Sequence, residues 1–370
     1  MQTNIQKIDW LFDLKEKVPQ FLEKLKGKKI PGFFHYSLSG DLYDENINWG
    51  LGNSVFAVKI YYTINTIDLL TENEINSIIN FIKGFQRSDG SIYDPLIHRR
   101  ASLRNKLYAT RYLDFSNLWG QKTKRAETRQ SFSALRLLNS RPDLPYIQIP
   151  STRDRIDRYL GSLNWSKPYD AGSHFSHLLF FLNINKEMLN TYVDSTDYLI
   201  EYAIEWVNKL QSPEDGSWYR GQNISIGQKI NGAMKVLTGL EVANKLSFKY
   251  PDKLIDLCLS TISLEQACDT LDVLYVIYYA NQLTEGNHRY NDIQAFCYRW
   301  LKICKEHYYP YIGGFSFFKH RANQYYYGAK ITKGLNEPDI HGTVLLLWGI
   351  ALVSQILGID KELGFKEFIT

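Results

Sequence analysis

The chain has 370 residues, a formal net charge of +4 and a hydrophobic content of 44%. It is long enough to bury a large core. The charge is too small to indicate a nucleic-acid partner, and neither a basic helix nor a known reader motif accompanies it. Aromatic residues are abundant, with 26 Tyr, 19 Phe and 8 Trp. Because Tyr and Trp combine an apolar body with one polar group, some of them are expected to line a cavity.

Helical stretches of two kinds alternate along the chain. In the first kind, apolar residues such as Ile75, Ile78 and Ile82 recur at intervals of three and four, which leaves one polar side. These amphipathic stretches are 72–85, 152–163, 196–210, 251–262 and 291–307, with 8–25 as a further candidate. The second kind carries few charges and many small or apolar residues, and covers 54–69, 128–138, 173–182, 228–242, 269–280 and 341–356.

A short phrase recurs after three of the amphipathic stretches. It reads Gln86-Arg87-Ser88-Asp89-Gly90-Ser91-Ile92 in the first copy, Gln211 to Trp218 in the second, and Ile312-Gly313-Gly314-Phe315 in a shorter third copy. Glycine can adopt the positive φ that such a turn requires, and the following apolar residue is expected to fill the space between neighbouring helices. Repeats spaced by tens of residues predict stacked helical pairs.

Together these patterns predict an all-α fold, a single (α/α)6 toroid that spans residues 1–370. The weakly charged helices form its inner layer and the amphipathic helices its outer layer. Two connections, 92–125 and 316–337, are too long to be simple links. Both are rich in Lys and Arg, so we expect them to be rim loops that are either solvated or able to cover the cavity.

The inner helices all begin with polar residues. In a toroid these starts lie at one mouth of the cavity, where helix N-termini favour anions. Candidate catalytic residues at this mouth are Asp269, Asp272, His174, His177 and His341, and candidate substrate-binding residues are Arg129, Gln130, Tyr169, Gln228 and Asp339. The alternative is structural, because Asp, Ser and Thr at helix starts are ordinary caps and histidine often packs or bonds a carbonyl.

The compartment and membrane predictions rest on a few features. Cys258, Cys268, Cys297 and Cys304 show no metal-binding spacing and are too few for a disulfide framework. The N-terminus lacks the pattern of a signal peptide. The apolar run 342–359 is nearly long enough to span a membrane, but a central helix buried on all sides has the same pattern. We therefore expect a cytoplasmic protein without an integral membrane segment.

Several phrases are similar to those of the terpenoid cyclase and protein prenyltransferase superfamily, whose members are helical toroids. The segment Gln211 to Trp218 resembles the repeat of squalene-hopene cyclases, and Gly313-Gly314-Phe315 resembles the prenyltransferase β-subunit version. The segment Asp339 to Thr343 looks like the helix start that supplies a zinc-binding histidine in that β-subunit.

The resemblance also implies candidate metal ligands. Cys268 and His341 match two zinc ligands of the β-subunit. Gln266 occupies the position where the family has its Asp ligand, and Asp269 lies too far along the helix to replace that ligand. A helix turns by about 100° per residue, so the Asp269 carboxylate is displaced from the original ligand position. We therefore predict no tightly bound zinc and assign no cofactor, while a divalent metal at the histidines is left open. The cyclases use an Asp-x-Asp-Asp acid, which Asp269 and Asp272 do not reproduce.

Three functions follow from these patterns. The first is an enzyme acting on an isoprenoid or its diphosphate, with Arg129 and helix N-termini holding the anion and Asp269 or Asp272 moving a proton. The second is a glycan lyase, epimerase or hydrolase, with Tyr169 stacking a sugar and His174 moving the proton. The third is a non-catalytic binding toroid. An apolar cavity favours the first, and an open groove favours the second. The sequence identifies no partner subunit.

Overall fold

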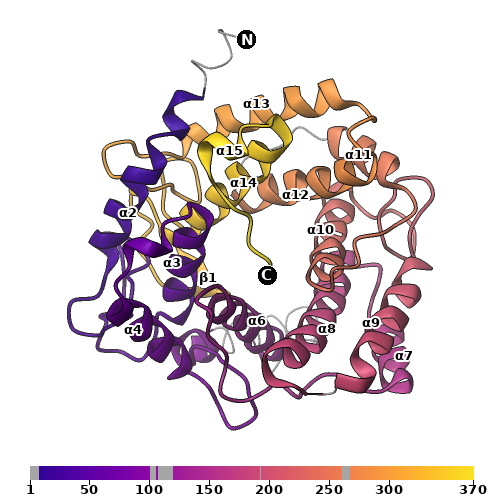
Figure 1. Ribbon diagram of the computed structural model, residues 1–370, viewed down its shortest axis with the longest axis horizontal. Helices are drawn as coiled ribbons and strands as arrows, with labels where there is room; N and C mark the ends of the chain where they lie inside the picture. The colour runs from indigo at the N-terminus through magenta and orange to yellow at the C-terminus, as the bar shows by residue number, and fades with distance from the viewer. Residues whose placement is uncertain (1–7, 101–105, 107–119, 192, 261–266) are drawn as a thin grey trace. The chain divides into compact units, whose positions relative to one another are not determined.

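The computed structural model describes residues 8–100, 106, 120–191, 193–260 and 267–370, and of residues 193–194 and 267–270 only the backbone. Most of these residues are helical, and the single sheet among them is the antiparallel pair β1 (Tyr325–Tyr326) and β2 (Ala329–Lys330). The prediction of an all-α chain is confirmed. The helices, traced along the chain in Figure 1, are η1 (Asp9–Leu11), α2 (Leu14–Leu25), α3 (Leu51–Thr63), η2 (Ile67–Leu69), α4 (Glu72–Lys83), α6 (Gln121–Leu137), α7 (Arg153–Ser162), α8 (Pro168–Leu189), α9 (Val193–Asn208), α10 (Ile226–Val242), α11 (Pro251–Leu259), α12 (Ala267–Leu283), α13 (Tyr290–Glu306), α14 (Ile340–Leu357) and α15 (Asp360–Leu363).

The chain divides into two compact units. Unit 1 comprises Met1–Leu144, Leu301–Ser354 and Gly358–Phe368, and unit 2 comprises Pro145–Trp300, Gln355–Leu357 and Ile369–Thr370. Each unit draws on segments that are far apart in the sequence. The expectation that residues 1–370 form one toroidal domain stays a prediction.

The two predicted kinds of helix are present. In α4 only Ile78 and Ile82 are buried, and in α7 only Ile156 and Leu160, so both helices have one apolar side. In α3, by contrast, every residue except Tyr62 is buried. The apolar run near the end of the chain forms α14, and 78% of this helix is buried. Within the described residues it is the one helix long and apolar enough to cross a membrane, and its burial is that of a core helix.

Within each unit, helices pack both against their own kind and against the other kind. In unit 2, α10 packs against both α8 and α12, while α7 packs against α9. In unit 1, α3 packs against α6 and α4. The contact of α8 with α10 is close because small residues lie at the crossing: a Cβ atom on Gly232 would be 2.6 Å from Pro168 Cβ.

The repeated phrase forms the same turn in both full copies. Gln211 Nε2 donates to the Gly216 carbonyl at 2.9 Å, and its Oε1 accepts from the Lys249 N–H at 3.0 Å. Gln86 Nε2 likewise donates to the Gly90 carbonyl at 3.1 Å, and its Oε1 accepts from the Asp143 N–H at 2.8 Å. Each glutamine therefore closes its own turn and ties that turn to a later segment.

The glycines and apolar residues of the phrase behave as predicted in all three copies. Gly216 has a φ of 73° and Gly313 a φ of 99°, in the region that favours glycine. The apolar residues that follow the turns are Ile92, Trp218 and Phe315, and each is 0% exposed. The shorter third copy pairs Tyr308 with Phe315 in a β-bridge, just as Gln211 pairs with Trp218.

Several predicted helix starts are wrong. The helix α6 begins at Gln121, so residues 127–130 lie in its second and third turns. Of the predicted rim loop 92–125, residues 95–100 and 121–125 are helical. The first turns of α6 are strongly charged and partly exposed, so they lack the apolar spacing that identifies a helix. The helix α8 likewise begins at Pro168, well before the predicted start at Ser173.

Candidate functional site

Two buried carboxyl groups of unit 1, those of Asp94 and Glu127, form the centre of the candidate site. These residues are 1% and 2% exposed, respectively. The Asp94 N–H donates to Glu127 Oε2 at 3.1 Å. Glu127 Oε1 is buried and has no hydrogen-bond partner among the described residues. Because an unpaired buried acceptor is costly, this oxygen is the place where a proton or a ligand group is expected.

Asp94 is positioned by two helix starts. Its Oδ2 accepts from the Gly50 N–H at 2.7 Å, at the beginning of α3. Its Oδ1 accepts from the Leu96 N–H at 2.9 Å and from the Ile97 N–H at 3.1 Å, in the helical residues 95–100. One side chain therefore caps two helices and fixes the backbone from which Asp94 bonds to Glu127.

Burial changes the protonation of both carboxyl groups. It raises the pKa of Asp94 to about 6, although several backbone N–H groups favour the ionised form. Burial, and then the nearby charge of Asp94, raise the pKa of Glu127 well above its ordinary value. Burial therefore favours the protonated form of Glu127, which is the form that a general acid requires.

Aromatic rings surround the imidazole of His341, which lies in the first turn of α14. The imidazole stacks on Phe56 with ring centroids 4.8 Å apart, and Phe317 lies 5.0 Å away. The Tyr36 hydroxyl is hydrogen-bonded to His341 Nδ1 at 3.1 Å. Burial among these rings lowers the pKa of His341 to about 3, so the imidazole is neutral at pH 7 and can accept a proton.

Tyr326 of β1 links the carboxyl groups to the aromatic rings. Its ring lies edge-on to Phe56 at 5.7 Å and to His341 at 5.9 Å. A Cβ atom on Gly52 would be 2.7 Å from the Tyr326 hydroxyl, so this close approach to α3 requires glycine. Burial chiefly raises the pKa of Tyr326 well above its ordinary value, and the charges of Glu127 and Asp94 add to this effect.

Tyr36 is held in place by the loop on either side of it. Asp41 Oδ2 accepts from the Tyr36 N–H at 2.9 Å, and Asp41 Oδ1 accepts from the Ser37 N–H at 2.9 Å. The hydrogen bond from His35 to Asp41 raises the pKa of His35 and adds a third anchor. Asp41 is thus a positioning residue for the hydroxyl group that contacts His341.

The predicted residues of unit 1 have different roles. His341 belongs to the site, as described above. Asp339 is 0% exposed and caps α14, because its Oδ1 accepts from the Gly342 N–H at 2.8 Å. Gln130 Oε1 accepts from Lys59 Nζ, and Arg129 is 5% exposed in the interior of α6. Asp339 is therefore a helix cap, as the structural alternative expects. Arg129 and Gln130 do not lie at a helix start, so that alternative does not apply to them.

The predicted residues of unit 2 lie on α8, α10, α12 and their flanks. His174 Nδ1 is hydrogen-bonded to the Tyr159 hydroxyl of α7 at 2.7 Å, and His177 is buried. Tyr169 is 41% exposed and lies under the Lys235 ammonium. Gln228 is exposed in the first turn of α10, and Asp272 is buried in α12. His174 and Tyr169 each contact a neighbouring helix, α7 and α10 respectively.

The metal prediction depends on residues that are only partly described. The side chains of Cys268 and Asp269 lie outside the described residues, as does the whole of Gln266. Among the described residues, no group of three or more His, Cys, Asp and Glu side chains could hold a metal ion. His341 itself is enclosed by aromatic rings. The absence of a tightly bound zinc stays a prediction.

Sequence reasoning missed three residues of the site. Glu127 belongs to a polar phrase that was interpreted as a helix start, and Tyr326 lies in a predicted loop. Asp94 follows the first copy of the repeat by two residues. Two signals were available in the sequence. One is the run of three tyrosines at 325–327, and the other is the pair of acidic residues, Asp94 and Glu127, near the two ends of the predicted loop 92–125.

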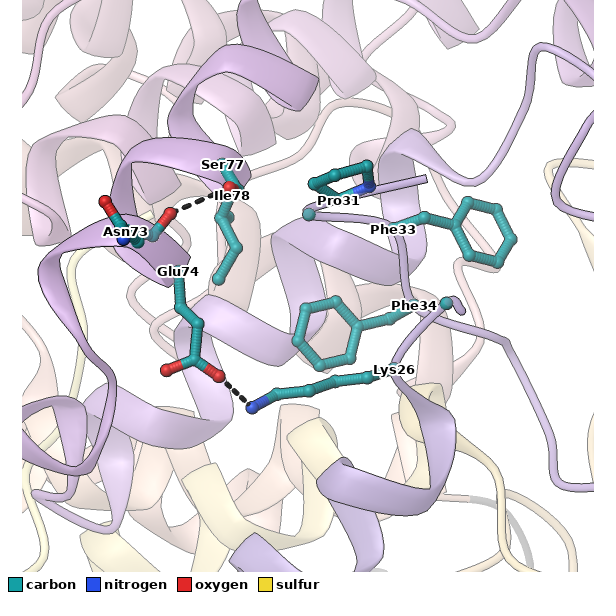
Figure 2. Close-up of a pocket in the computed structure, with 10 residues that line it drawn as sticks. Lys26, Pro31, Phe33, Phe34, Asn73, Glu74, Ser77 and Ile78 are labelled. Carbon is teal, nitrogen blue, oxygen red and sulfur yellow. Dashed lines mark hydrogen bonds and ion pairs between the residues drawn. The ribbon is translucent and has the colours of Figure 1, made fainter. Parts of the chain in front are cut away.

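A separate pocket lies at the edge of unit 1, between the loop after α2 and the first turns of α4 (Figure 2). Its volume is about 210 Å³, and its lining is mostly apolar, with Phe33, Phe34 and Ile78. At one side Lys26 Nζ donates to Glu74 Oε1 at 2.5 Å. The hydrogen bond from Lys26 is the largest of the causes that lower the pKa of Glu74 to about 2. None of the acid–base residues described above lines this pocket.

No protein-family model matches the sequence, and no curated protein matches it. The proposed function therefore rests on the geometry and the chemistry of the site.

Proposed function

We propose that the chain is an (α/α)6 toroid and an enzyme that converts an isoprenoid by acid–base catalysis in its interior. Two observations support the toroid. Buried and amphipathic helices alternate along the chain, and within each unit a helix packs against helices of its own kind and of the other kind. The turns that close three of the helical pairs also share one geometry. These are features of concentric helical layers.

One observation carries the proposed activity: Glu127 is a buried acid with an unpaired oxygen and a raised pKa, near a group of aromatic rings that includes Tyr326. Protonation of a carbon–carbon double bond produces a carbocation. The faces of aromatic rings attract cations, and they do so more strongly in a site without water. The Glu127 carboxylate formed in this step would attract the same cation, which compensates in part for its burial.

The second half of the reaction needs a base. Neutral His341, with the Tyr36 hydroxyl at its Nδ1, is suited to remove a proton from the carbon next to the cation and so restore a double bond. Burial raises the pKa of Glu127 and lowers the pKa of His341. Such opposite shifts are the usual way in which one site provides both an acid and a base. One proton leaves Glu127 and another is taken up by His341, so the substrate is isomerised or cyclised.

The geometry favours a start by protonation over a start by loss of diphosphate. The N–H groups at the beginning of α3 bond to Asp94, and those at the beginning of α14 bond to Asp339. These two helix starts therefore already hold a carboxyl group of the chain, and a diphosphate there would add further negative charge. Arg129 remains a candidate for binding a polar end of the substrate.

The other proposals are less well supported. A glycan enzyme would use His174, which already bonds Tyr159. A non-catalytic binder would not require the opposed protonation states of Glu127 and His341. The cytoplasmic location stays part of the proposal, and it is supported by the buried free thiols of Cys258, Cys297 and Cys304.

Deuterium incorporation tests the proposed reaction. Wild-type protein is incubated with geraniol, farnesol, geranylgeraniol and squalene in D2O, and the products are examined by mass spectrometry. We expect one added deuterium in the product and a loss of conversion of about 100-fold or more in Glu127→Gln, because the amide keeps the shape of the acid but cannot protonate carbon. Glu74→Gln, a substitution outside the site, is the control. Equal deuterium incorporation in Glu127→Gln, or no conversion of any isoprenoid by wild type, contradicts the proposal.

A further inference from the structure

The ring of Phe368 lies in a slot in the interior of unit 1. One face of the ring stacks on Trp348 of α14, with centroids 4.5 Å apart and planes 29° apart. Lys59 Nζ of α3 lies 4.7 Å from the centroid of the same ring. Burial, and then the nearby charge of Arg129, lower the pKa of Lys59 well below its ordinary value. Phe368 is 4% exposed, so the ring is enclosed. The slot therefore combines an aromatic surface and an N–H donor, both of which interact favourably with the face of an aromatic ring.

The walls of the slot belong to long, buried helices. Lys59 is 2% exposed and donates to Gln130 Oε1 of α6, which holds the amino group in place. Trp348 is 5% exposed. The occupant, in contrast, comes from the short segment 364–368, in which the Lys366 N–H donates to the Thr63 carbonyl at 2.8 Å. The walls are thus part of the helical core, and only the occupant belongs to a non-helical segment.

The slot continues the surface of the candidate active site. Lys59 follows Phe56 by three residues on α3, and Gln130 follows Glu127 by three residues on α6. Trp348 follows His341 by seven residues on α14. Residues three or seven apart lie on the same face of a helix. The slot therefore lies one to two turns further along the faces that carry the acid–base residues.

We propose that Lys59 and Trp348 form a binding slot for an electron-rich, uncharged aromatic ring, and that Phe368 of the same chain fills this slot in the present structure. Rings with more electron density than benzene, such as indole and phenol, attract an N–H group at their faces more strongly than phenylalanine does. The contacts are made to the faces of the ring, so the slot does not require the rest of a peptide chain. This inference is independent of the isoprenoid substrate.

The test removes the intramolecular occupant and supplies a free ring. Indole and p-cresol are titrated against wild type and Phe368→Ala, with calorimetry and the thermal midpoint as readouts. Apolar cavities left by truncation bind small aromatic molecules. We expect indole to bind Phe368→Ala and raise its midpoint, and wild type to bind at least about tenfold more weakly because its slot is filled. In the double variant Lys59→Met with Phe368→Ala, the affinity for indole should fall by about threefold.

The control is Phe365→Ala, which truncates another buried side chain of unit 1 at 4% exposure, close to Phe368 in the sequence. It should lose stability without gaining affinity for indole. If Phe368→Ala does not fold alone, refolding in excess indole should restore the native circular dichroism spectrum. A folded Phe368→Ala that binds no indole, an equal gain in Phe365→Ala, or failure of indole to restore folding would overturn the proposal.

Discussion

Two aspartates of unit 1 show how a helix cap becomes a group with a shifted pKa. Asp339 accepts from the Phe317 N–H at 2.8 Å and from the Asn323 N–H at 3.1 Å, in addition to capping α14. Such bonds normally favour the carboxylate. Burial outweighs them and raises the pKa of Asp339 to about 7. Asp94, with a pKa of about 6, follows the same rule. Both groups therefore exchange protons in a range where an unfolded aspartate is fully ionised.

This shift makes the free energy of unfolding depend on pH. Because the folded pKa of Asp339 is raised above its unfolded value, the folded state binds more protons between about pH 4 and pH 7, and its stability falls as the pH rises through this window. The slope is at most about 1.4 kcal/mol per pH unit for one group. Asp339→Asn keeps an oxygen acceptor and should lose this slope. Urea unfolding at a series of pH values provides the measurement.

The wild-type curve alone does not isolate Asp339, because His341 acts in the opposite direction. Its folded pKa of about 3 lies below the unfolded value, so it destabilises the folded state as the pH falls from about 6.5 to 3. The informative quantity is the difference between wild type and Asp339→Asn. A difference that does not change between pH 4 and pH 7 contradicts the assignment.

At the scale of residues, the sequence predicted that His341 belongs to the candidate site but did not predict Glu127. His341 was identified because it follows Asp339 at the start of an apolar helix. Glu127 was not, since the charged residues around it resemble a solvated surface, and only the fold shows that this carboxyl group is buried. The protonation state depends on burial, which cannot be derived from the residue type. Asp94 and Glu127 are 33 positions apart, so their contact is equally invisible in the sequence.

At the scale of elements, prediction succeeded where periodicity was strong. The one-sided burial of α4 and the burial of most of α14 follow directly from their apolar spacing. The predicted helix starts were wrong where tertiary contacts, and not local capping residues, determine the first residue of the helix. Gly120 precedes α6 with a φ of 67° and no side-chain cap, and the first turns of that helix are charged. Asp94 caps α3 from a distant position in the sequence.

The crossing of α8 and α10 gives a prediction at this scale. A Cβ atom on Gly232 would meet Pro168 Cβ at 2.6 Å and the Pro168 carbonyl carbon at 2.9 Å, and backbone atoms cannot move aside easily. Gly232→Ala should therefore lower the free energy of unfolding by about 1–3 kcal/mol, as overpacking does. Gly227→Ala, on the same helix with nothing within 4 Å, is the matched control and should not lose stability. Equal stability of the two variants in urea unfolding contradicts the close crossing.

At the scale of the whole molecule, the open point is whether the two compact units form one cooperative structure. In the proposed toroid, each helical pair contacts two neighbouring pairs, and no pair has a free end. Loss of any pair would expose apolar surface on both of its neighbours. A closed ring of this kind should therefore unfold in a single step, whereas two independent units should unfold separately.

Differential scanning calorimetry of variants in each unit tests this. We expect one transition with equal calorimetric and van 't Hoff enthalpies, because both units would unfold together. Gly232→Ala in unit 2 and Phe365→Ala in unit 1 should each shift that same transition to lower temperature, and each should leave a single peak. Two resolved transitions, of which Gly232→Ala moves one and Phe365→Ala the other, would show that the units are separate domains. The single (α/α)6 toroid would then be wrong, while the acid–base site, which lies wholly within unit 1, would not be affected.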